Sequence, residues 1–250
     1  MDNLKYGVLG RPLELKKTYD FCAGEPELTV VMIHGIASDS STFNKALAYL
    51  TGTRSLKNVR FVTFDLLGSG ESYKSDNLDY GYTEQIEALH NSIEKLKSTT
   101  PLVLVGHSMG TLIVTRYAST YKTAAKQLIL LSPPVYTEAD LDNPAFNMAM
   151  RAFQEAVSVR DREVVKSKAF INSINKIVKN RKNYKRLKEL TTPAILIYGI
   201  EDQIIAPYNI PKVVRENPKY LTVIRTPGRH GVSREKYSKM VNMLEEVLNG

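Results

Sequence analysis

The sequence predicts an α/β protein with a mostly parallel central sheet and helices on both faces. Short apolar runs without polar breaks, suited to strands buried on both faces, alternate with stretches whose apolar residues recur at helical spacing. This alternation is typical of parallel strands joined by helical crossovers. The length of 250 residues, with 43% hydrophobic and 24% charged residues, allows one large core in a globular protein.

The expected elements follow from these patterns in chain order. Residues 4–21, with a turn at Gly10-Arg11-Pro12, are expected to form a hairpin ahead of the main sheet. Strands are expected at six apolar runs, which span residues 28–33, 59–64, 102–105, 127–131, 193–199 and 220–224. Helices are expected at residues 43–50 and 82–96, after residue 108, and after each of the last two strands.

The pattern changes between residues 135 and 190. No strand-like run occurs there, and apolar residues such as Phe146 and Met150 stand at helical intervals. We therefore expect a helical cap at residues 135–190, inserted between a first part of the core at 1–134 and a second part at 191–250.

Composition excludes several classes of protein. Cys22 is the only cysteine, so an internal disulfide and a thiolate metal cluster are both excluded. No apolar run approaches the roughly 20 residues that a membrane helix needs. The N-terminal residues lack the basic-then-apolar layout of a secretory signal, so a cytoplasmic location is expected.

The apolar run at residues 102–105 leads into Gly-His-Ser-Met-Gly at residues 106–110. A serine on a sharp strand-to-helix turn has its hydroxyl pushed away from the backbone. Glycines suit the flanking positions, because a side chain at either one would collide across the turn. Ser108 is therefore a candidate nucleophile, and strand, turn and helix occur in the order that this chemistry requires.

A second turn follows the run at residues 28–33, where His34 and Gly35 precede Ile36. Gly35 permits close approach and unusual backbone dihedrals, so the N–H of Ile36 can point inward as an oxyanion donor. The alternative is an ordinary strand-to-helix turn that contains a buried histidine.

A serine hydroxyl needs a base to attack at neutral pH, and the base needs an orienting carboxylate. His230 follows the last expected strand, and Asp202 follows the strand before it. Because loops after parallel strands emerge at one edge of the sheet, Ser108, Asp202 and His230 can converge there. Two carboxylates are rivals for the acid: Glu201, and Asp65, whose loop we expect instead to fix backbone geometry near the site.

In their order along the chain these motifs resemble the α/β-hydrolase superfamily, particularly its small capped serine esterases and monoglyceride-lipase-like members. The similarity covers nearly the whole chain and rests on His34-Gly35, residues 65–72, residues 106–110, Gly199 with Asp202 and Pro207, and His230. It implies Ser108 as nucleophile, His230 as base and Asp202 as the partner of the base. It also implies an oxyanion hole formed by the backbone N–H groups of Ile36 and Met109.

The resemblance implies acyl transfer to water, with a carboxylic ester of a small or medium acyl group as the expected substrate and no metal or organic cofactor. Thioester and carbon–carbon bond hydrolysis use the same machinery and stay open. Dehalogenases and epoxide hydrolases of this fold carry an aspartate in place of Ser108, and proline iminopeptidases carry a longer Gly/Pro-rich oxyanion motif, so these activities are disfavoured. The family pattern favours Asp202 over Glu201. A non-catalytic ligand-binding member of the fold is the alternative from another class; it would show a damaged triad or oxyanion loop, and this chain shows neither.

The positive charge of the chain is concentrated in the expected cap. The stretch from Arg151 to Lys188 holds twelve Lys or Arg residues against three acidic ones, whereas the whole chain has a formal net charge of +8. In the resembled family a cap helix lies over the site, so a positive field there could steer an anionic substrate or an anionic lipid surface toward Ser108. The alternative is a solvated helical face that keeps the protein soluble. Nucleic acid is not expected as a partner, because the stretch has no interleaved aromatic pattern beyond Phe170 and Tyr184.

Overall fold

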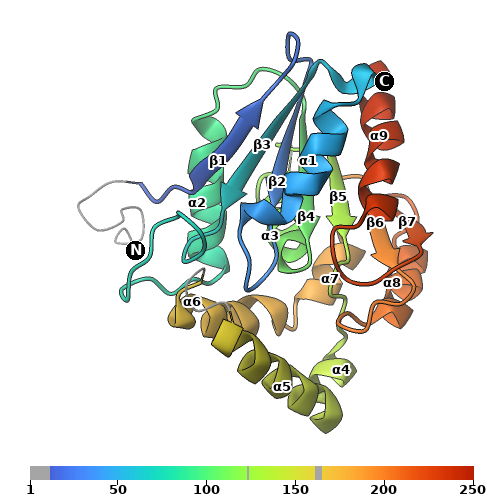
Figure 1. The fold of residues 1–250 in the computed structure, drawn as a ribbon. Coiled ribbons are helices and arrows are strands. Elements are labelled where there is room, and N and C mark those ends of the chain that lie inside the picture. The colour runs from blue at the N-terminus through green and yellow to red at the C-terminus, as the bar shows by residue number, and fades with distance from the viewer. Residues whose placement is uncertain (1–11, 123, 161–164) are drawn as a thin grey trace.

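The computed structural model describes residues 12–122, 124–160 and 165–250, and in this part of the chain seven strands form one sheet (Figure 1). The strand order is β1-β3-β2-β4-β5-β6-β7, and every neighbouring pair is parallel except β1 with β3. The strands are β1 (Lys16–Phe21), β2 (Leu28–Ile33), β3 (Val59–Asp65), β4 (Leu102–His107), β5 (Gln127–Leu131), β6 (Ala194–Gly199) and β7 (Leu221–Thr226). The predicted mostly parallel sheet is confirmed.

The first strand corrects one expectation. The sequence suggested a hairpin lying ahead of the main sheet, but β1 is the edge strand of that sheet and runs antiparallel to β3, with Asp20 opposite Val62. Most of its side chains are exposed, because an edge strand has a single neighbour. The expected first half of the hairpin and most of its turn fall in residues 1–11, which lie outside the described part of the chain.

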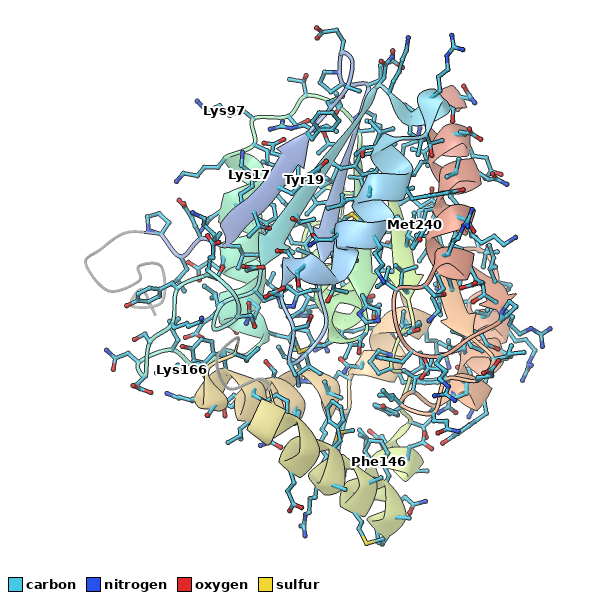
Figure 2. All side chains as sticks on the ribbon, viewed as in Figure 1. Lys17, Tyr19, Lys97, Phe146, Lys166 and Met240 are labelled. Carbon is cyan, nitrogen blue, oxygen red and sulfur yellow. The ribbon has the colours of Figure 1, made fainter. Side chains whose placement is uncertain are left out.

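Helices cover both faces of the sheet. On one face α1 (Asn44–Thr51) and α9 (Arg234–Asn249) pack their apolar residues, among them Leu50 and Met240, against the strands (Figures 1 and 2). On the other face lie α2 (Tyr82–Glu94), α3 (Met109–Thr120) and α8 (Ile210–Glu216). Every residue of β2 is buried as a result, which is why its sequence shows no polar alternation.

The segment 135–190, which we call the cap, is helical. It contains α4 (Glu138–Asp142), α5 (Pro144–Arg160), α6 (Ser167–Asn172), the π-helical stretch η3 (Ser173–Val178) and α7 (Asn183–Lys188), all between β5 and β6. Figure 1 shows α4, α5 and α6 below the end of the sheet toward which β5 points. The other end of the cap returns to the core, where α7 packs against α3 and α8.

The second half of the cap is fastened to core loops by polar contacts. The backbone N–H of Lys166 donates to the carbonyl of Gly68 at 2.9 Å, and the hydroxyl of Tyr82 donates to the side-chain oxygen of Asn183 at 2.6 Å. These contacts hold the cap over the carboxyl edge of the sheet. Among the described residues, no helix has both the length and the apolar composition needed to cross a membrane.

Candidate active site

Ser108 lies at the turn between β4 and α3, in a backbone conformation that residues other than glycine rarely adopt, with φ 51° and ψ −120°. The turn is tight, with Gly106 at the end of β4 close to the start of α3, and Gly110 of α3 close to β2. A Cβ on Gly106 would lie 2.5 Å from the carbonyl carbon of Gly110, and a Cβ on Gly110 would lie 2.1 Å from the carbonyl oxygen of Ile33. The predicted collision across the turn is confirmed at Gly106; at Gly110 glycine is needed for a different reason, because a side chain there would collide with the end of β2.

The turn brings Ser108 within hydrogen-bond distance of His230. The Nε2 atom of His230 lies 2.9 Å from Oγ of Ser108, and its Nδ1 atom lies 2.9 and 3.2 Å from the two carboxylate oxygens of Asp202. Since a carboxylate only accepts, Nδ1 carries the proton and Nε2 is free to accept the proton of the serine hydroxyl. This is the arrangement that a general base for Ser108 requires.

The surroundings of Asp202 favour its ionised form. Burial of its side chain raises the pKa, but hydrogen bonds from His230 and from the backbone N–H groups of Ile204 and Ile205 outweigh that effect and hold the pKa below its usual value. An ionised carboxylate at this place orients the imidazole and stabilises it when it becomes charged.

The rival carboxylates lie elsewhere. Glu201 is exposed to solvent. Asp65 is buried and accepts hydrogen bonds from the backbone N–H groups of Ser40 and Glu71, both at 2.8 Å. It therefore ties the loop after β2 to the loop after β3, and the structure places Asp202, rather than Glu201 or Asp65, against His230.

The loop after β2 lies directly against the serine. A Cβ on Gly35 would lie 3.0 Å from Cβ of Ser108, which is tighter than an ordinary contact, so glycine at this position allows the close approach. Within the described residues, the backbone N–H groups of Ile36 and Met109 have no hydrogen-bond acceptor. Ile36 lines the same cavity as Ser108, and Met109 begins α3, so both donors remain available beside Ser108.

His34 fits the alternative reading of this turn, since it is a fully buried structural residue. Its Nε2 accepts the backbone N–H of Leu66 at 2.9 Å, and its Nδ1 donates to the carbonyl of Gly35 at 2.7 Å. Burial lowers the pKa of His34, which keeps the ring neutral and able to accept. The turn thus contains both a buried histidine and a free N–H at Ile36.

A cavity of about 460 Å³ opens at Ser108 and His230. Its floor is the carboxyl edge of the sheet, and its opposite wall is apolar and comes largely from the cap, with Phe146 of α5 labelled in Figure 2. The cap residues that line it are Tyr136, Phe146, Ala149, Met150, Phe153, Ile174 and Val178. The volume falls within the roughly 300–1,000 Å³ of small-molecule sites.

Two residues at the site were not singled out from sequence. His107 is buried beside the serine, and its Nε2 lies 3.0 Å from the backbone carbonyl of His230. Lys236 is fully buried in the first turn of α9 and contacts the loop that carries His230. A lysine on a surface helix suggests solvent exposure; the one signal against it is that Lys236 stands four residues before the buried Met240, on the same helix face.

The positive charge of the cap is partly offset in the folded chain. Among its cations, Lys166 pairs with Asp76 at 3.0 Å and Arg181 pairs with Asp142. Lys176, Lys185 and Lys188 also have carboxylate partners. The charge balance counted along the sequence therefore overstates the local field; two of the three acidic residues in that count, Asp161 and Glu163, lie outside the described residues.

No group of three or more His, Cys, Asp or Glu side chains in the described part of the chain is arranged to hold a metal ion. Ser108, His230 and Asp202 form a serine–histidine–aspartate arrangement at the cavity.

Known proteins share this sequence and this fold. The chain is 31% identical over 118 residues to the probable lysophospholipase BODYGUARD 5 of Arabidopsis thaliana, which covers 47% of this chain and 27% of that protein. It is 23% identical over 239 residues to Lipase 1 of Psychrobacter immobilis, covering 83% of this chain and 72% of the lipase. The chain thus spans about a quarter of the length of the BODYGUARD proteins that it matches.

Solved structures of similar fold include a monoacylglycerol lipase of Paleococcus ferrophilus, with a TM-score of 0.68, 22% identity and coverage of 94% of this chain and 98% of the lipase. A thermophilic esterase of Thermogutta terrifontis gives a TM-score of 0.71 at 19% identity, covering 98% of this chain and 96% of the esterase. The family model described as serine aminopeptidase, S33, matches residues 24–185, which is more than half of the chain. The chain therefore belongs to the serine aminopeptidase S33 family, within the α/β-hydrolase superfamily.

Proposed function

We propose that this protein is a serine hydrolase that cleaves carboxylic esters of small or medium apolar acyl groups through an acyl-enzyme intermediate. The observation that carries the proposal is the hydrogen-bonded series Asp202–His230–Ser108 at the floor of a cavity with an apolar wall. The names of similar proteins, which include a lipase and probable lysophospholipases, agree with an ester of an apolar acid.

In the proposed reaction, Nε2 of His230 takes the hydroxyl proton as Oγ of Ser108 attacks the ester carbonyl carbon. The carbonyl oxygen becomes an oxyanion that accepts hydrogen bonds from the N–H groups of Ile36 and Met109. His230 then returns the proton to the departing alcohol oxygen, and the acyl group stays on Ser108. Water, deprotonated by the same imidazole, attacks the acyl-enzyme; Ser108 regains the proton and the acid leaves.

Asp202 supports both steps from the far side of the imidazole. During each step His230 carries a positive charge, and an ionised carboxylate 2.9 Å from Nδ1 stabilises that charge. The hydrogen bonds from Ile204 and Ile205 keep the carboxylate in place and ionised.

The family description names an aminopeptidase, but the cavity favours an ester. An aminopeptidase must hold the ammonium group of its substrate, and a carboxylate is the usual partner for such a charge. Among the described residues that line the cavity, none is acidic. An apolar acyl chain needs no such partner and gains free energy from burial against the cap.

A panel of p-nitrophenyl esters with increasing acyl length tests the proposal, with Ser108→Ala as the control. We expect turnover to be highest for a small or medium acyl group and to be lost in the control. Binding of the esters without turnover by the unmodified protein would favour the alternative of a ligand-binding member of the fold. Faster turnover of matched thioesters or of carbon–carbon bond substrates would reassign the scissile bond.

We also propose that the basic cap favours an anionic substrate or an anionic lipid surface over neutral ones. Lys179 and Lys182 support this, because neither has a carboxylate partner among the described residues. The ion pairs of the neighbouring cations limit the expected size of the effect.

A further inference from the structure

Three consecutive backbone carbonyls in the loop between β7 and α9 accept hydrogen bonds from buried side chains. The Nζ atom of Lys236 lies 2.5 Å from the carbonyl oxygen of Arg229 and 2.9 Å from that of Gly231. Between them, the carbonyl of His230 accepts from Nε2 of His107 at 3.0 Å. Lys236 therefore holds the backbone of the residues before and after His230, and His107 holds the backbone of His230 itself.

The third hydrogen bond of Lys236 anchors it to the sheet. Its Nζ lies 2.7 Å from Oγ of Ser132, the residue directly after β5. Ser132 is itself fixed, since its backbone N–H donates to the carbonyl of Ile197 in β6 at 2.7 Å. An ammonium group has three N–H donors, and here each one has its own acceptor. Lys236 thus connects the histidine loop to two strands of the central sheet.

Backbone contacts hold the start of this loop. The carbonyl of Gly228 accepts from the backbone N–H of Glu201 at 3.1 Å, and a Cβ on Gly199 would lie 2.1 Å from the same oxygen. Among the described residues, the carbonyls of Arg229 and His230 accept no backbone hydrogen bond. The hydrogen bonds from Lys236 and His107 therefore fix the part of the loop that backbone contacts leave unpaired.

A buried ammonium is costly to keep, which argues that it has a use. The side chain of Lys236 is fully buried, and burial lowers its pKa to about 8, although nearby Asp202 and Glu235 act in the opposite direction. The group is still mainly charged at neutral pH. The desolvation cost of this ammonium is offset by its hydrogen bonds to acceptors in the loop that carries His230 and at the end of β5, so the group connects these two segments.

We propose that Lys236 is a positioning residue, whose hydrogen bonds to the carbonyls of Arg229 and Gly231 hold the imidazole of His230 at hydrogen-bond distance from Ser108. The inference rests on the proposed function, because it concerns the geometry of proton transfer in that reaction. A displacement of about 1 Å between reacting groups can cost about 10²-fold in rate. Since Lys236 lies outside the cavity lining, its loss should leave substrate binding largely intact.

The test compares Lys236→Met, Lys236→Gln and, as a control, Lys239→Met in ester hydrolysis and in chemical denaturation. Lys239 is an exposed lysine one turn further along α9. For Lys236→Met we expect kcat to fall about 10- to 100-fold, with KM within about threefold of the unmodified value. Lys236→Gln keeps two N–H donors and should lose less activity, whereas Lys236→Met leaves the carbonyls of Arg229 and Gly231 without this donor and should lose more stability. Lys239→Met should match the unmodified protein.

A structural role would give another pattern. If Lys236 served only packing, Lys236→Met would keep its kcat and Lys236→Gln would be the more impaired variant; that order, or a loss confined to KM, overturns the inference. If Lys236→Met does not fold, Lys236→Gln carries the test, and an unchanged kcat in it counts against the role. Absence of ester turnover in the unmodified protein overturns the proposed function and this inference with it, whereas full turnover in Lys236→Met overturns the inference alone.

Discussion

The two walls of the cavity are built in different ways. At the sheet edge, hydrogen bonds fix the functional groups. The imidazole of His230 lies 2.9 Å from Oγ of Ser108 and 2.9 Å from a carboxylate oxygen of Asp202. The backbone carbonyl of His230 accepts a hydrogen bond from His107. On the cap side the wall is made by apolar side chains such as Phe146 and Met150, which carry no hydrogen bond to the floor. The interactions that build the sheet-edge wall depend on direction, and those that build the cap wall do not.

This difference predicts that the sheet edge controls catalytic activity and that the cap controls substrate selectivity. A hydrogen bond weakens steeply when its angle or length changes, so the sheet edge holds a single arrangement of reacting atoms. Apolar contact is roughly proportional to the area buried and has no preferred direction, so the cap sets how much acyl chain is accommodated. Substitutions at the edge should therefore lower kcat for every substrate, and substitutions in the cap should change the preference among substrates.

Removal of the Ser108 hydroxyl should have the largest effect of any substitution at the sheet edge. Ser108→Ala should lower ester turnover by several orders of magnitude, because the remaining hydrogen-bond donors and the binding cavity supply only residual catalysis. A fluorophosphonate should label Ser108 covalently in the unmodified protein, as checked by peptide mass spectrometry. Labelling of another serine, or turnover that survives the substitution, would contradict the assignment.

Substitution of the Asp202 carboxylate should have the next largest effect, and it distinguishes Asp202 from the neighbouring Glu201 as the partner of His230. Asp202→Asn should fold but lose roughly 10³–10⁴ in turnover, since an amide in place of the carboxylate favours the wrong imidazole tautomer. Glu201→Gln is the matched control, because Glu201 is exposed and adjacent in sequence. If Glu201→Gln loses activity and Asp202→Asn keeps it, the acid has been misassigned.

A cap substitution should change selectivity rather than chemistry. Phe146→Ala removes a ring that lines the cavity and packs edge-on against Tyr136, with 4.7 Å between ring centroids. Burial of such a ring is worth roughly 1.5–3 kcal/mol, so kcat/KM for an octanoyl ester should fall about tenfold while that for an acetyl ester changes less than about twofold. Met148→Ala on the same helix is the control, since Met148 is 70% exposed. Equal losses for both esters would mean that the cap does not contact the acyl chain.

The smallest effect concerns the charge of the cap. Lys179 and Lys182 have no carboxylate partner within the part of the chain that the structure describes, whereas neighbouring cations form ion pairs. We expect kcat/KM for an anionic ester to fall a few-fold as salt rises past about 0.1 M, where the screening length is about 10 Å. A neutral ester of equal size should change little, and Lys179→Gln with Lys182→Gln should flatten the difference. Identical salt profiles for the two esters in the unmodified protein argue against substrate steering, and failure to bind anionic vesicles argues against a lipid surface.

Much of the sheet edge could be read from the sequence because its signals are local. Apolar runs predicted the parallel strands, and the two glycines around Ser108 predicted a tight turn that the backbone contacts confirm. Loops that follow the parallel strands of one sheet emerge at the same edge, so the sequence predicted that His230 and Ser108 share that edge. Their contact is made by the tertiary structure, because β5 and β6 lie between the two strands that carry them. The edge strand β1 was mistaken for part of a separate hairpin, because its alternation does not say which strand it will pair with.

Thus the sequence by itself determined the apolar strands, the turn that carries the candidate nucleophile Ser108 and the loops that carry Asp202 and His230, since each depends on residues close together in the chain. Only the tertiary structure decided that Lys236 points inward to hold the loop of His230, and that cations of the cap meet carboxylates such as Asp76. Burial and pairing depend on which distant segments pack together. Spacing along a helix can show which face a lysine occupies, but the group that it meets there comes from another part of the chain.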